Sequence, residues 1–343
     1  MKISKNLQSI IAPLSSAAAV MSDGFLRQGM QQLGASMQQK RVCGTVINYY
    51  HRPAHIQVRT RLPVHTITKI LYPKVTTLGS DIAEHVPIVL VHGLGDNALT
   101  WTMTMALMGA GRDIYALDLP GYGFSSLPCD HTYASIDEMV ELVQCFLRDI
   151  VGRPAMIVGN SMGGWIAARL GMVTPELLDK LVLINAGGAY LEGRLSWEPF
   201  LEVVGSSDLQ MTRRAIRQVL GFIPAIFAYV GQQGIQERFQ RQVVQAFMSA
   251  ANENDFMTMD QLRRLRVPVA VVWGLRDEFL PQGSLEFFLQ AFPNMPALLV
   301  DRCGHLPQRE RPLLLARFLD EQAIRLDLVQ SSAPGKQYQQ NNH

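Results

Sequence analysis

The 343-residue sequence contains no run of 18 or more uninterrupted apolar residues, so a membrane-spanning helix is not expected. It also lacks a dominant charge, because 31 Lys and Arg residues oppose 29 Asp and Glu residues for a formal net charge of +2. This balance gives no reason to expect nucleic acid or a strongly acidic partner. Hydrophobic residues make up 48% of the chain. The length then allows one large α/β domain with an insertion, or two ordinary domains.

Cysteine is scarce and widely spaced. The four residues, Cys43, Cys129, Cys145 and Cys303, include no C-x-x-C pair. This spacing argues against a zinc site and against a dense disulfide framework. We therefore expect free thiols in a reducing compartment, and a cytoplasmic protein that could associate with a membrane surface through its N-terminal segment; secretion is less favoured by the sequence.

Residues 1–41 read as an amphipathic N-terminal extension. Apolar residues recur there every three or four positions between Ser, Gln and Asn, which predicts one or two helices with a break near Pro13. These residues are Ile3, Leu7, Ile10, Leu14, Ala17, Met21 and Phe25. The pattern is compatible with a helix packed on its own domain, with contact to a membrane surface, or with a signal peptide.

Strand and helix patterns alternate over most of the remaining chain. Residues 42–50 and 64–72 carry Val, Ile, Thr and Tyr between turn residues, which predicts two leading antiparallel strands. Short continuous apolar runs follow, as expected of strands buried on both faces of a parallel sheet. The runs are 86–91, 113–117, 155–158, 181–184, 267–273 and 298–300. Because helical stretches separate them, they predict an α/β fold with a doubly wound, mostly parallel sheet.

The alternation stops between residues 189 and 264, where helical patterns and an apolar cluster occur. We interpret this segment as a helical lid inserted between two parts of the core, 42–188 and 265–328. Residues 329–343 are rich in Ser, Gln and Asn, which predicts a disordered tail. The apolar cluster in the lid supplies candidate substrate-binding residues, Phe222, Ile226 and Phe227.

Ser161 lies at a predicted strand-to-helix corner. An apolar run ends at Val158, and a stretch of helical composition begins at Trp165, so the Gly159-Asn160-Ser161-Met162-Gly163 motif spans the turn. Glycine at both flanking positions leaves room where strand and helix nearly touch. Such a turn forces the serine into a strained conformation that presents its hydroxyl above the sheet. The motif therefore predicts a nucleophile elbow.

Two later strand exits carry the groups that would activate a serine. Residues Leu275-Arg276-Asp277 follow the strand 267–273, and Cys303-Gly304-His305 follow the strand 298–300. In a doubly wound sheet the carboxyl ends of the strands meet at one edge, so these side chains should gather there. The chain order nucleophile, acid, histidine is the order expected of α/β-hydrolases.

Together these motifs resemble those of α/β-hydrolase-fold enzymes, over roughly residues 42–328. The matching blocks are His92-Gly93, Asp118 to Gly123, Gly159 to Gly164, Gly274-x-x-Asp277-x-x-x-Pro281, and Gly304-His305. The resemblance implies an α/β-hydrolase fold with a helical lid. Met162 and Gly164 are also usual in its esterase, lipase and carbon–carbon hydrolase branches.

The chemistry of these residue types suggests a role for each. A neutral imidazole at His305 would take the proton of Ser161 as the hydroxyl attacks, and Asp277 would hold the imidazole in the correct tautomer. The backbone N–H groups of Leu94 and Met162 are candidates for an oxyanion hole. His92 is expected to shape the oxyanion loop, Asp118 to cap its own loop, and Cys303 to serve packing.

These residues predict a carboxylic-ester hydrolase that acts through an acyl-serine intermediate, with no metal and no organic cofactor. Its substrate would be a small-molecule or lipid-like ester with an apolar acyl group. A carbon–carbon hydrolase of dienoic ring-cleavage products is a second hypothesis, although His92 to Asp96 departs from the Gly-Pro-Gly-type loop usual in that branch. A non-catalytic binding protein of this fold is a third hypothesis, and a cofactor-independent peroxidase activity could accompany the same triad.

Overall fold

The computed structural model describes residues 23–54, 86–191, 219–220 and 237–331. Within these ranges eight strands form one sheet in the order β1-β2-β4-β3-β5-β6-β7-β8. The pairs β1–β2 and β2–β4 are antiparallel, and all remaining pairs are parallel. The predicted doubly wound, mostly parallel sheet is thereby confirmed. No helix within the described ranges is long and apolar enough to cross a membrane.

The parallel strands are the predicted apolar runs. They are β3 (Ile88–Val91), β4 (Ile114–Leu117), β5 (Ala155–Asn160), β6 (Leu178–Ile184), β7 (Val269–Gly274) and β8 (Ala297–Val300). Successive residues point to opposite faces: Val89 and Val91 belong to one hydrophobic cluster, and Ile88 and Leu90 to the other. Both faces of β3 to β7 are buried, which is why these runs are continuous rather than alternating. Strand β8 lies at the edge of the sheet, and of its four residues only Val300 is buried.

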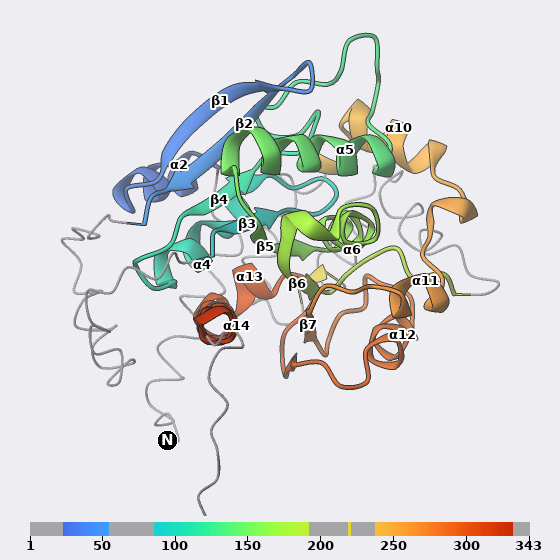
Figure 1. Cartoon of the computed structure of the whole chain (residues 1–343). Coiled ribbons are helices and arrows are strands. Elements are labelled where there is room, and N and C mark those ends of the chain that lie inside the picture. The colour runs from blue at the N-terminus through green and yellow to red at the C-terminus, as the bar shows by residue number, and fades with distance from the viewer. Residues whose placement is uncertain (1–22, 55–85, 192–218, 221–236, 332–343) are drawn as a thin grey trace, which may run out of the picture.

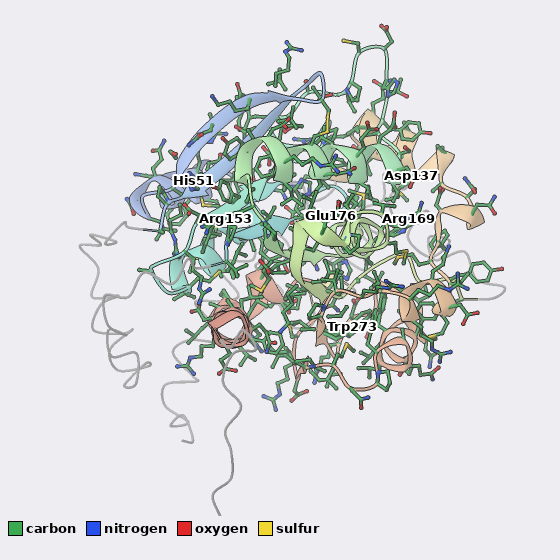
Figure 2. All side chains as sticks on the ribbon, viewed as in Figure 1. His51, Asp137, Arg153, Arg169, Glu176 and Trp273 are labelled. Atoms are coloured by element: carbon green, nitrogen blue, oxygen red, sulfur yellow. A yellow bond between two sulfur atoms is a disulfide. The ribbon has the colours of Figure 1, made fainter. Side chains whose placement is uncertain are left out.

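Helices cover the two faces of the sheet (Figure 1). Helices α5 (Ile136–Phe146), α6 (Met162–Val173) and α12 (Ser284–Ala291) pack on the face that carries Val89. Arg169 of α6 pairs with Asp137 of α5 at 2.5 Å where the two helices lie side by side (Figure 2). The opposite face is covered by α2 (Asp23–Gln32), α4 (Thr102–Leu107) and α14 (Pro312–Ser331).

The expected boundary at residue 41 is wrong, because the core begins earlier. Leu26 and Met30 of α2 are buried in the core cluster beneath the sheet. Strand β1 (Ser36–Val42) pairs with β2 (Thr45–Arg52) through the two-residue turn Cys43-Gly44. Both turn residues have positive φ, 45° and 81°, as a type I′ hairpin requires. The predicted partner strand 64–72 and residues 1–22 lie outside the described residues.

Cys43 in the hairpin turn forms a disulfide with Cys145 in α5, 102 residues later. The expectation of four free thiols is therefore wrong for this pair, while Cys129 and Cys303 remain thiols. Closing a loop of about 100 residues restricts the unfolded chain and stabilises the fold by about 4–5 kcal/mol in the chain-entropy treatment. The bond attaches the edge hairpin to the helix that covers the sheet.

Between β6 and β7, the described residues are helical or irregular apart from isolated bridge residues, among which Ala189 pairs with Met257. The helices are α10 (Gln242–Ala250) and α11 (Met259–Arg263), and a short 3₁₀ turn, η4 (Glu253–Asp255), lies between them. Trp165 of α6 donates its indole N–H to the carbonyl of Asp255 at 3.1 Å. This contact joins the inserted segment to the helix that follows Ser161. After β8 the chain forms α13 (Pro307–Glu310) and then α14, which continues to Ser331, beyond the expected end at 328.

Candidate active site

Ser161 occupies the corner between β5 and α6 with φ +56° and ψ −118°. This conformation is rare for a non-glycine residue and costs on the order of 1–3 kcal/mol. Backbone hydrogen bonds hold it in place: Ser161 N–H donates to the Ile184 carbonyl at 3.0 Å, and Gly187 N–H donates to the Ser161 carbonyl at 3.0 Å. A Cβ at Gly159 would lie 2.2 Å from the Gly163 carbonyl oxygen, so the corner requires glycine there. The elbow expected from the sequence is present.

The turn Gly93 to Asp96 after β3 lies against Ser161. A Cβ at Gly93 would be 3.0 Å from the Ser161 Cβ, and Asp96 N–H donates to the Gly93 carbonyl at 3.2 Å. Leu94 is therefore carried by a tight turn beside the serine. In the described part of the chain, no backbone acceptor is paired with the Leu94 N–H. Met162 is the first residue of α6, so its N–H has no partner within the helix.

Asp277 and His305 form a buried hydrogen-bonded pair. Asp277 follows β7, which ends just after Trp273 (Figure 2), and its Oδ2 lies 2.8 Å from His305 Nδ1. Burial acts to raise the pKa of Asp277, but His305 and the hydrogen bonds that the carboxylate accepts outweigh it, and the pKa falls below its usual value. The carboxylate is therefore ionised, and Nδ1 carries the proton it donates. The other imidazole nitrogen, Nε2, is left to accept a proton.

Two asparagines hold this pair in place, and both roles were missed from the sequence. Asn185, which follows β6, donates to Asp277 Oδ2 at 2.6 Å and accepts from Gly274 N–H at 3.0 Å. Asn160, the residue before Ser161, donates to the His305 carbonyl at 3.0 Å. The elbow and the histidine loop are thus joined directly. Side-chain amides give no sequence signal for such pairings, because their partners lie on other strands.

The neighbouring candidates have structural roles. His92 Nε2 accepts from Leu119 N–H at 3.0 Å, so its Nδ1–H donates to the Gly93 carbonyl at 2.8 Å and holds the turn that carries Leu94. Asp118 accepts from Phe124 N–H at 2.9 Å, which confirms that it caps its loop. Cys303 is fully buried, and burial raises the pKa of its thiol, in agreement with packing.

Apolar side chains lie close to these groups. The Phe279 ring is 4.5 Å from the His305 imidazole, and a Cβ at Gly95 would meet the Phe239 ring at 3.0 Å. His305 N–H donates to the carbonyl of Val219 at 2.7 Å, so the inserted segment reaches the histidine loop. The candidates Phe222, Ile226 and Phe227 lie outside the described residues. Among the described residues, no group of three or more His, Cys, Asp or Glu side chains is placed to hold a metal ion.

Comparison with known proteins places this geometry in context. Pimeloyl-[acyl-carrier protein] methyl ester esterase of Aeromonas hydrophila is 24% identical over 237 residues, which cover 66% of this chain and 90% of the esterase. The structure of a membrane phospholipase A superposes with a TM-score of 0.68 at 22% identity, covering 94% of this chain and 99% of the phospholipase. A 2-hydroxy-6-oxo-6-phenylhexa-2,4-dienoate hydrolase from Rhodococcus superposes with a TM-score of 0.63 at 22% identity, covering 85% of this chain and 99% of the hydrolase.

At these identities the solved structures show a shared fold, with esterases, lipases and carbon–carbon hydrolases among them. The family model described as "Alpha/beta hydrolase family" matches residues 88–318, which include β3, the elbow and both later strand exits. The chain therefore belongs to the α/β-hydrolase family.

Proposed function

We propose that this protein is a serine hydrolase that cleaves carboxylic esters with an apolar acyl group through an acyl-serine intermediate. The observation that carries the proposal is the meeting of two features at one edge of the sheet. Ser161 is held in a strained turn directly against Gly93, and the neighbouring His305 loop bears an imidazole paired with a buried carboxylate. Such a combination suits activation of a serine hydroxyl.

In the proposed reaction, His305 Nε2 takes the proton of the Ser161 hydroxyl as its oxygen attacks the ester carbonyl carbon. The backbone N–H groups of Leu94 and Met162 donate to the oxyanion that forms. As the tetrahedral intermediate collapses, the C–O bond breaks and the leaving alcohol takes the proton from His305. Water then repeats the sequence on the acyl-serine and releases the acid. Asp277 remains ionised throughout and stabilises the imidazolium.

The apolar side chains around the Asp277–His305 pair support the preference for an apolar acyl group. Phe279 and Phe239 lie against the imidazole and the oxyanion turn, and Val219 and Leu220 are buried beside the histidine loop. We propose that Phe222, Ile226 and Phe227, which follow in the sequence, also bind the acyl group. The methyl ester esterase among the relatives agrees with ester chemistry.

The proposal is tested with a panel of p-nitrophenyl esters of increasing acyl length, run beside a dienoic ring-cleavage ketone. We expect ester turnover that rises with acyl length and is abolished by Ser161→Ala, together with loss of labelling by a fluorophosphonate probe. Preferential turnover of the ketone would instead assign carbon–carbon bond cleavage. Absence of turnover and of labelling in the wild type would refute serine catalysis and favour a binding role.

A further inference from the structure

Four charged side chains from four separate segments meet beside the oxyanion turn. Asp96, at the end of the turn, accepts on Oδ1 from Arg309 of α13 at 2.7 Å and from Arg238 at 2.6 Å. Arg238, which lies before α10, also pairs with Asp23 at the start of α2. Two carboxylates and two guanidinium groups balance each other's charge. The reaction proposed above uses none of them.

Asp96 is the last residue of the turn, and its side chain is held there by the two guanidinium groups. His92 holds the turn at one end through the Gly93 carbonyl, and the Asp96 N–H closes it onto the same carbonyl. Between these two anchors lies the peptide of Leu94, whose N–H is the proposed donor. Gly95 follows with φ +72°, in the left-handed region that glycine adopts readily because it has no side chain. The hydrogen bond from the Asp96 N–H closes the turn from within, and the Asp96 carboxylate adds a second constraint from outside it, because Oδ1 is held by two guanidinium groups.

The cluster also connects the turn to the histidine loop. Arg309 lies four residues after His305, is buried, and donates through Nε to Thr100 Oγ1 at 2.7 Å as well as to Asp96. A buried guanidinium needs its partners, because an unpaired charge in the interior is strongly unfavourable. The position of Asp96 is thus set from two directions, by α13 and by the segment that carries Arg238.

We propose that Asp96 is a positioning residue for the oxyanion hole, held by Arg309 and Arg238, and that it acts through the N–H of Leu94. The inference rests on the proposed ester hydrolysis. Because the oxyanion exists only after attack, a misplaced donor should lower kcat and leave KM nearly unchanged. Since Arg238 comes from the segment between β6 and β7, that segment helps to set the donor geometry.

The test compares Asp96→Asn and Arg238→Gln with a control, Asp113→Asn. Asp113 also pairs with two basic side chains, His51 at 2.8 Å and Arg153 at 3.6 Å, but it directly precedes β4 and so lies at the amino ends of the parallel strands. His51 and Arg153 are labelled in Figure 2. For each purified variant, kcat and KM are measured on the best ester. The inhibition constant of a trifluoromethyl ketone, which forms a hemiketal oxyanion on the serine, is measured alongside, with the melting temperature as a check of folding.

We expect Asp96→Asn to lower kcat about 10- to 100-fold and Arg238→Gln about 3- to 10-fold, each less than complete loss of an oxyanion donor. The ketone should bind more weakly by a similar factor, with KM within about twofold, and Arg238→Lys should recover part of the loss. The control should keep wild-type kcat and ketone binding.

If Asp96→Asn fails to fold, Arg238→Gln decides alone, because it leaves the Asp96–Arg309 pair in place. Wild-type kcat and ketone affinity in Arg238→Gln, or a fall in melting temperature without a change in either constant, would overturn the inference. In that case wild-type ester turnover would leave the proposed function standing. A wild-type protein that cleaves no ester would refute both the proposed function and the positioning role of Asp96.

Discussion

Replacing Asp277 with asparagine should prevent His305 from acting as the general base while leaving the protein folded. The carboxylate is buried and only accepts hydrogen bonds. Oδ2 accepts from His305 Nδ1 and Asn185 Nδ2, and Oδ1 accepts from the N–H groups of Phe279 and Leu280. Asp277→Asn converts one acceptor to an NH₂ group, so either orientation of the amide sets this group against two donors.

The two orientations of the new amide differ in whether the donors that face its NH₂ group can change their protonation. Backbone N–H groups cannot give up their protons, whereas the imidazole can move its proton from Nδ1 to Nε2. The amide oxygen should therefore stay with Phe279 and Leu280, and the NH₂ group should face His305. With its proton on Nε2, His305 cannot accept one from Ser161. We expect kcat to fall about 10⁴-fold, which corresponds to about 5.5 kcal/mol of barrier.

The assay is steady-state hydrolysis of the best p-nitrophenyl ester, with circular dichroism to show that the fold is retained. Asp301→Asn is the matched control. Its side chain is 80% exposed and pairs with the neighbouring Arg302, so kcat should stay within about twofold of the wild type. If Asp277→Asn kept kcat within tenfold of the wild type, Asp277 would not be the residue that orients His305, and the pairing seen here would be structural only.

Three further predictions concern stability. Burial raises the pKa of Asp320 to about 6, so its contribution to stability is full below about pH 4 and is lost as the pH rises through 6. Relative to Asp320→Asn in urea melts, the wild type should lose roughly 2.4 kcal/mol between pH 4 and pH 7, and a constant difference would contradict the shift. Titration of the unreduced, denatured protein should find two thiols, and four after reduction. Cys43→Ser with Cys145→Ser should lower the melting temperature by several degrees, whereas Cys129→Ser should not. Deleting residues 1–37 should abolish the cooperative melt, because it removes α2 and part of β1, and a retained melt would contradict their place in the core.

Much of the fold was predictable because its information is local. A strand buried on both faces must be apolar at every position, so runs such as 86–91 mark the parallel strands. Strand β1 was missed for the same reason, since it lies at the edge of the sheet with mostly exposed side chains and carries Ser, Gln, Lys and Arg. Its place depends on pairing with β2, which no pattern within its own seven residues reports.

The sequence by itself determined which chemical groups stand at the ends of the strands: a serine between glycines, an aspartate and a histidine, in that order. The tertiary structure decided which side chains form hydrogen bonds, ion pairs and disulfides with one another. It bonded Asn185 to Asp277 and Asn160 to the His305 loop, and it paired Cys43 with Cys145. It also brought the partners of Asp96 together from α13 and from the segment before α10. Periodicity and motif spacing are properties of neighbouring residues in the chain. Hydrogen bonds, ion pairs and disulfides depend on distances between segments far apart in sequence, and only folding sets those distances.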